Sequence, residues 1–192
     1  MNDYFLIGRR IGLRPILRTD LPTVMRWTNE PEVTLYMTMG TFPNTIEAYE
    51  HEYELLVGEK TASLLQLPNF PRNLIFAVCR KEDGQHIGNV GIFGVNWVQR
   101  VAELRIIIGD KSAWRQGFAS EAYSLAAGYA LDRLNLRRLW AGAREDNIGS
   151  IRALEKIGFV REGAFRQNVL RNERAYDTVL LGMLRDEFKP FG

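Results

Sequence analysis

The alternation of hydrophobic and polar residues predicts a chain of mixed helices and strands. Two helical patterns come early, a short one with Leu21, Val24 and Trp27 on its apolar side and a longer one over residues 44–65. Later apolar stretches read mainly as strands. The predicted strands cover residues 5–15, 74–80, 86–98, 101–109, 139–144, 159–170 and 175–184, and two further helices cover residues 118–134 and 147–157. This order predicts an α/β domain.

No internal repeat, low-complexity segment or linker interrupts these patterns. A chain of 192 residues is long enough to bury a core without disulfides or a structural metal. We therefore predict a single domain over residues 1–192.

Composition narrows the class of protein. The chain has 25 Lys and Arg against 23 Asp and Glu, which is too balanced to predict a nucleic-acid surface. No stretch approaches the roughly 20 apolar residues that cross a bilayer, and no signal peptide is visible. Cys79 is the only cysteine and lies in an apolar run, so we expect a buried, inert thiol, a reducing compartment and a cytoplasmic protein. With two histidines, a metal site is not expected.

The stretch between Glu103 and Phe159 carries the candidate chemistry. An apolar strand with three consecutive isoleucines leads to a turn that contains Gly117, and this glycine opens the next helix. A helix N-terminus presents unpaired N–H groups that favour phosphate, and a glycine allows close approach. The turn lacks the Gly-Lys-Ser/Thr ending of a P-loop and the three glycines of a dinucleotide fingerprint.

Two motifs in this stretch resemble those of the GNAT acetyltransferase superfamily. Residues 114–122 read WRQGFASEA and are similar to its pyrophosphate loop, Gln/Arg-x-x-Gly-x-Gly/Ala, with Trp in place of the first residue. About 30 residues later, Asn147, Ser150 and residues 154–159 are similar to its Asn-x-x-Ala/Ser…Tyr-x-x-x-Gly-Phe segment. The end of the chain resembles the Rim-type branch, which acetylates the N-termini of ribosomal proteins.

The resemblance implies a fold and a cofactor. The expected fold is a mixed, mostly antiparallel sheet with one splayed strand pair and helices on both faces. Residues 1–73 would form the substrate side, and residues 74–192 the cofactor-binding core with a C-terminal hairpin. The cofactor is acetyl-CoA, whose pantetheine arm pairs with the backbone of the splayed strand. The residues expected to bind it are Ile106, Ile107, Ile108, Arg115, Gln116, Gly117, Phe118, Ala119, Ser120 and Asn147.

Catalysis requires a neutral amine, a stabilised oxyanion and a departing thiolate. An alkyl ammonium is almost fully protonated at neutral pH, so a base or a water relay helps, and the resemblance favours Glu103 for this role. A salt bridge from Glu103 to a nearby arginine is the alternative. A backbone N–H near Ile107 would meet the oxyanion. The tyrosine that usually protonates the thiolate is replaced by Leu154, which leaves Ser150 or water as the donor.

The predicted function is N-acetyl transfer from acetyl-CoA to a primary amine, either a protein N-terminus or a small molecule. The alternatives are a polyamine, aminoglycoside or amino-sugar acetyltransferase, or a non-catalytic acyl-CoA-binding regulatory module. Neither nucleic acid nor membrane is expected as a partner, and a homodimer is left open. Glu47, Glu50 and Glu54 share one helical face, which would attract a cationic amine if it is not simply a solvated surface.

Overall fold

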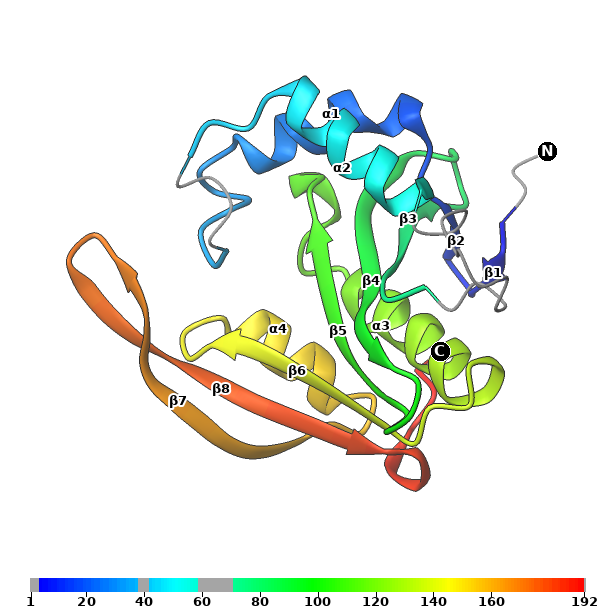
Figure 1. The fold of residues 1–192 in the computed structure, drawn as a ribbon, viewed down its shortest axis with the longest axis vertical. Helices are drawn as coiled ribbons and strands as arrows, with labels where there is room; N and C mark the ends of the chain where they lie inside the picture. Colours follow the sequence, from blue (N-terminus) through cyan, green and yellow to red (C-terminus); the bar gives the residue numbers. More distant parts are fainter. Residues whose placement is uncertain (1–3, 38–41, 59–70, 192) are drawn as a thin grey trace.

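The computed structural model describes residues 4–37, 42–58 and 71–191, and its centre is an eight-stranded sheet with the order β1-β2-β3-β4-β5-β6-β8-β7 (Figure 1). The strands are β1 (Leu6–Ile7), β2 (Ile11–Pro15), β3 (Leu74–Arg80), β4 (His86–Asn96), β5 (Val101–Ile108), β6 (Arg138–Arg144), β7 (Val160–Arg171) and β8 (Arg174–Leu184). The α-helices are α1 (Leu21–Thr28), α2 (Ile46–Gly58), α3 (Phe118–Gly128) and α4 (Ile148–Glu155).

One pairing in the sheet is incomplete. Strands β5 and β6 are parallel and pair only at three positions, the last of which joins Glu103 to Trp140. Beyond Glu103, β5 continues beside β4 as far as Ile108, while β6 continues beside β8. The other pairings among the described strands are antiparallel. The mixed sheet with a splayed strand pair, expected from the resemblance, is therefore confirmed.

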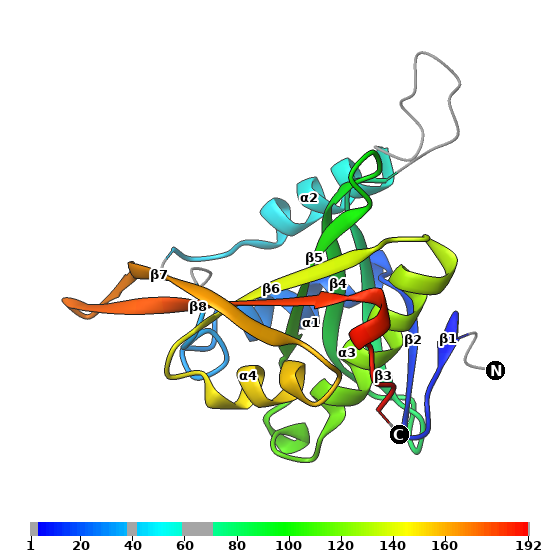
Figure 2. The same cartoon turned by 90° about the horizontal axis from the view of Figure 1, so that it is seen from below.

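Helices cover both faces of the sheet (Figures 1 and 2). The main core joins α3 and α4 to the inward side chains of the strands, including Ala102 and Leu104 of β5. A smaller cluster on the opposite face joins Val24 and Trp27 of α1 to Ile107. Because side chains alternate along a strand, Glu103 and Ile107 face the α1 side, while their neighbours face α3.

Several element boundaries differ from the predictions. The segment 5–15 is two short strands, because the Gly8 N–H bonds the Ile11 carbonyl at 2.9 Å and closes a turn. The helix predicted over 118–134 changes after Gly128 to a π-helical turn, Tyr129–Arg133. The end of the helix predicted over 44–65 lies outside the described residues. The sheet also joins strands from both predicted parts of the chain, 1–73 and 74–192.

A polar cluster around the buried Asp20 holds the turn after β2 against the end of that strand. The two Nη atoms of Arg14 donate to the Asp20 carboxylate at 2.7 and 2.8 Å, and the Leu17 N–H adds a bond of 2.8 Å. Burial opposes ionisation, yet these bonds hold the pKa of Asp20 below its usual value. Cys79 lies nearby, and burial raises the pKa of its thiol, as expected for an inert cysteine.

Within residues 4–37, 42–58 and 71–191, none of the helices combines the length and apolar character needed to cross a membrane.

Candidate active site

The loop before α3 has the backbone shape of an anion site. Arg115 and Gly117 are both left-handed, with φ of 61° and 83°, and Gly117 is the N-cap of α3. Left-handed residues are typical of the backbone concavities in which successive N–H groups turn toward one side and bind an anion. The positive end of the helix dipole adds to this field. The loop therefore has both features that a pyrophosphate needs.

The other loop residues expected to bind the cofactor share this helix start. Phe118 and Ser120 bury their side chains, with 5% and 3% exposed, so only their backbone groups are free to face a ligand. The Gln116 side chain turns back to donate to the Ser112 carbonyl at 2.6 Å. Arg115 is exposed, and Ala119 packs on the core.

Trp114 explains the departure from the family pattern at the first motif position. Its indole Nε1 donates to the Ile108 carbonyl at 2.7 Å, which fastens the loop to the end of β5. A Gln or Arg would offer a polar side chain at this position, whereas the indole supplies one N–H and a flat apolar surface. The substitution therefore keeps the loop close to the strand.

Beyond Glu103, the edge of β5 that faces β6 has backbone groups that β6 does not pair with. A side chain on Gly88 of β4 would collide with the Ile107 carbonyl oxygen, so this oxygen faces β4. Backbone groups alternate between the two edges of an antiparallel strand, which turns those of Ile106 and Ile108 toward the splay. The expectation that Ile107 binds the cofactor, or the oxyanion, through its backbone is thus not supported by its orientation. Its side chain instead packs beside Trp27.

Glu103 lies where β5 and β6 separate. Its neighbours across the sheet are Phe93 on β4 and Trp140 on β6, and residues paired in this way project to the same face. The carboxylate is 14% exposed and accepts a bond of 2.7 Å from Arg105, whose guanidinium lies 5.0 Å from the centre of the Phe93 ring. The Glu103 carboxylate is thus a hydrogen-bond acceptor beside aromatic residues, and it already forms a salt bridge with Arg105.

The start of α4 brings Asn147 and Ser150 together. The Asn147 side chain caps the helix by accepting the Ser150 N–H at 3.2 Å. Leu154, at the position of the family's tyrosine, is fully buried in the core, with 0% exposed. Asn147 therefore performs the structural role that its residue type favours, and Leu154 offers no proton.

Tyr123 is a candidate that the sequence pattern did not reveal. It projects from α3 into the core, is 3% exposed and hydrogen-bonds the Ser150 side chain. Burial raises the pKa of Tyr123 to about 12, the Ser150 bond opposes this rise, and the negative charge of Glu103 adds to it. Three elements, α3, α4 and β5, thus bring polar groups to the point where the strands separate.

The segment after α1 is held against the C-terminal half of the chain by two arginines. Arg144 of β6 is 5% exposed, donates to the Leu35 carbonyl at 3.0 Å and lies between the rings of Tyr36 and Tyr176, at 4.8 and 4.2 Å. Arg171 of β7 donates to two further carbonyls of this segment. These contacts hold the segment after α1 beside the end of β6.

The acidic face of α2 is partly neutralised. Arg18 forms ion pairs with Glu50, at 3.7 Å, and with Glu54. All three side chains are about half exposed, so the pairs are screened by water. The attraction of a cationic amine by this face, raised as an expectation from the helical spacing, is correspondingly reduced.

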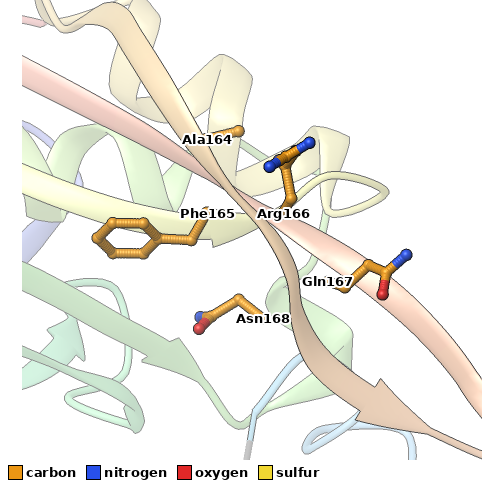
Figure 3. Close-up of a pocket in the computed structure, with 5 residues that line it drawn as sticks. All are labelled: Ala164, Phe165, Arg166, Gln167 and Asn168. Carbon is orange, nitrogen blue, oxygen red and sulfur yellow. The ribbon is translucent and has the colours of Figure 1, made fainter.

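A shallow hollow follows the bulge in β7 and is lined by one run of residues, 164–168 (Figure 3). The side chains of Phe165 and Asn168 project to one side of the strand, and that of Arg166 projects to the other.

Among residues 4–37, 42–58 and 71–191, no group of three or more His, Cys, Asp or Glu residues could hold a metal ion.

Comparisons with known proteins agree with this geometry. The family model described as "Acetyltransferase (GNAT) domain" matches residues 10–160. The N-acetyltransferase YoaA of Bacillus subtilis is 30% identical over 176 residues, 92% of this chain and 94% of that protein. The spermidine N(1)-acetyltransferase of Vibrio cholerae is 29% identical over 182 residues, 95% of this chain and 97% of its own.

A solved structure extends the similarity to the fold. The spermidine N-acetyltransferase from Vibrio cholerae, in complex with CoA and spermine, superposes with a TM-score of 0.80 at 23% identity, over 94% of this chain and 98% of that one. The pyrophosphate-type loop, the splayed strands and the family match together lead to one assignment. The chain belongs to the GNAT family and is an acetyl-CoA-dependent N-acetyltransferase.

Proposed function

We propose that this chain acetylates a primary amine of a small polycation, with a polyamine as the best-supported class. The observation that carries the proposal is the set of groups around Glu103. A carboxylate flanked by aromatic residues suits an alkyl ammonium, which gains both charge attraction and a cation–π contact. In the free protein, the Arg105 guanidinium takes this position. Arg105 is 60% exposed, so an incoming ammonium can displace it without breaking buried contacts.

Relatives support the same class. The spermidine N(1)-acetyltransferases of Vibrio cholerae and Escherichia coli are 29% and 25% identical to this chain and align with more than nine-tenths of it. The Rim-type branch, with protein N-termini as acceptors, stays a prediction that the same substrate screen tests.

The proposed acetyl donor site follows the strand edge and the loop. The pyrophosphate would accept bonds from the N–H groups of residues 116–120, with Asn147 near the pantetheine arm. The arm would pair with the outward backbone groups of Ile106 and with the N–H of Ile108, whose carbonyl already accepts the Trp114 indole N–H. This path directs the thioester carbonyl toward the separation point of β5 and β6, beside Glu103.

The proposed reaction is direct attack in a ternary complex. The amine nitrogen forms a bond to the thioester carbonyl carbon, and its extra proton passes to Glu103, directly or through one water. Collapse of the intermediate breaks the C–S bond and releases the CoA thiolate. A thiol with a pKa of about 8–9 is a fair leaving group, so a hydrogen bond from Ser150 to the sulfur suffices before solvent protonates it.

In the proposed mechanism, Tyr123 holds the Ser150 hydroxyl in position. Its hydroxyl stays protonated at neutral pH because its pKa is about 12. The Ser150 bond lowers the pKa of Tyr123, so Ser150 is its donor, and the proposed mechanism has the Ser150 hydroxyl turn from the Tyr123 oxygen to the sulfur as the thiolate leaves. Tyr123 is thus a positioning residue in the proposed mechanism.

A substrate screen tests the function. Release of free CoA thiol would be measured with spermidine and spermine, with peptides bearing free N-terminal amines, and with aminoglycosides. Turnover highest with the polyamines is expected. Preference for peptides would instead support the Rim-type prediction, and acetyl-CoA binding without turnover on any amine would support a regulatory module.

A further inference from the structure

An arginine from the first hairpin reaches the start of α3. Arg10 lies between β1 and β2, and its Nη1 donates to the carbonyl of Gln116 at 2.8 Å. Its guanidinium lies 4.6 Å from the centre of the Phe118 ring, and Nη2 is 3.4 Å from the point where a Cβ on Gly117 would lie. Arg10 therefore contacts Gln116 and Phe118, on either side of Gly117, in the loop proposed to hold the pyrophosphate.

The same arginine pairs with a buried carboxylate. Glu121 is in the first turn of α3 and its side chain is 4% exposed. One carboxylate oxygen accepts the N–H groups of Arg10 and Ile11 at 2.7 and 3.3 Å, and the other accepts Arg10 Nε at 3.1 Å. Arg10 thus connects this carboxylate to the loop carbonyl.

This arrangement poses an electrostatic problem for an anionic ligand. An acidic residue in the first turn is attracted by the positive end of the helix, and it opposes a phosphate that binds at the same end. Two charges near a protein surface still interact by 1–2 kcal/mol at roughly 8 Å. Unless Glu121 is neutralised, it would therefore weaken pyrophosphate binding.

We propose that Arg10 is a positioning residue for the acetyl-CoA pyrophosphate. It cancels the charge of Glu121 and holds the carbonyl of Gln116 away from the ligand, so that the loop N–H groups face the phosphates. The inference rests on the proposed pyrophosphate site, and it adds a residue more than a hundred positions away in sequence from the loop.

A double-mutant cycle on Arg10 and Glu121 tests the proposal. Dissociation constants for acetyl-CoA would be measured by calorimetry at low and high salt for Arg10→Gln, Glu121→Gln and the double variant. Arg10→Gln is expected to weaken binding about tenfold at low salt, and less at high salt because screening reduces the repulsion. The double variant, which has no unpaired charge, is expected within about threefold of the wild type. Arg9→Gln removes the same charge from the exposed neighbouring position and should leave the affinity unchanged.

A second ligand separates this role from a purely structural one. S-acetylpantetheine carries the thioester without the pyrophosphate, and a thermal-shift titration measures its weaker binding. Loss of acetyl-CoA affinity with unchanged S-acetylpantetheine affinity supports the proposal. Equal losses for both ligands, or a double variant no better than Arg10→Gln, overturn it. If Arg10→Gln does not fold, Arg10→Lys keeps the charge and is expected to retain most of the affinity.

The same measurements separate failure of the proposed role of Arg10 from failure of the proposed function. A wild-type protein that binds acetyl-CoA and acetylates an amine, with an Arg10→Gln variant of equal affinity, overturns only the role of Arg10. A wild-type protein that does not bind acetyl-CoA overturns both.

Discussion

Replacement of Gly117 by alanine isolates the contribution of one backbone angle to cofactor binding. The φ of 83° is in the left-handed region, which costs other L-residues about 1–2 kcal/mol. Space is not the obstacle, because the nearest atoms to an added Cβ are Arg10 Nη2 at 3.4 Å and the Phe191 ring at 4.0 Å. The expected cost in the free protein is therefore the backbone strain alone, with the fold retained.

This strain must appear in one of two measurements. If the loop stays left-handed in the free protein, the melting temperature falls by about 2–4 °C per kcal/mol. If the loop relaxes, the melting temperature is unchanged, and the acetyl-CoA dissociation constant rises about tenfold because binding must restore the conformation. Thermal melts give the loss of stability, and calorimetry on the same samples gives the loss of binding free energy. The sum of the two losses is expected near 1–2 kcal/mol.

Gly94 provides a matched control. Its φ is 57°, and an added Cβ would meet nothing within 4 Å. It lies in β4, away from the loop, so Gly94→Ala should lower the melting temperature by a similar amount and leave acetyl-CoA binding unchanged. Wild-type stability together with wild-type affinity in Gly117→Ala would refute the reasoning, and so would an equal loss of affinity in Gly94→Ala.

Three further predictions concern the chemistry and the fold. Glu103→Gln should lower kcat about a hundredfold or more without changing acetyl-CoA affinity, and unchanged turnover across a full pH profile would remove the base assignment. Tyr123→Phe should lower kcat severalfold, with no further loss when it is added to Ser150→Ala; additive losses in this double-mutant cycle would show that the two hydroxyls act separately. Asp20→Asn should destabilise the protein by about 2 kcal/mol at pH 7, because the partly exposed Arg14 guanidinium loses its charged hydrogen-bond partner. The lowered pKa of Asp20 means that its contribution is present above pH 4 and is lost as pH falls through the folded-state pKa, so denaturant melts should converge at low pH, and a constant gap down to pH 3 would contradict this reading.

Strong local patterns made most of the fold predictable. The strands from residue 74 onward and the helix at Gly117 have clear periodicity and turn residues, and the structure has them within a few positions. The first strand pair was predicted as one strand, because apolar residues continue on both sides of its turn at Gly8–Arg10. The change to a π-helical turn after Gly128 has no counterpart in the hydrophobic pattern of the sequence.

The candidate site was predictable only where it is local in sequence. The pyrophosphate-type loop and the cap at Asn147 follow from residue types at short spacing. Tyr123 matches an ordinary core position on its helix, and only the packing of α3 against α4 brings it to Ser150. Arg10 is more distant still, since its bonds to Glu121 span 111 residues. Helical and strand periodicity report which face of an element is buried, and they do not report which distant group meets it.

The separation of β5 and β6 links the two halves of the proposed site. A continued parallel ladder would satisfy the backbone groups of Ile106 and the N–H of Ile108, whose carbonyl already accepts the Trp114 indole N–H. Because pairing ends at Glu103, the break that frees a strand edge for the proposed acetyl donor begins at the proposed base. In the proposed mechanism, the acceptor amine and the thiolate are then served from opposite faces of one sheet, Glu103 on one side and Ser150 on the other. Leu154 on α4 belongs to the core, and in the proposed mechanism Ser150, held by Tyr123 of α3, serves the thiolate in its place.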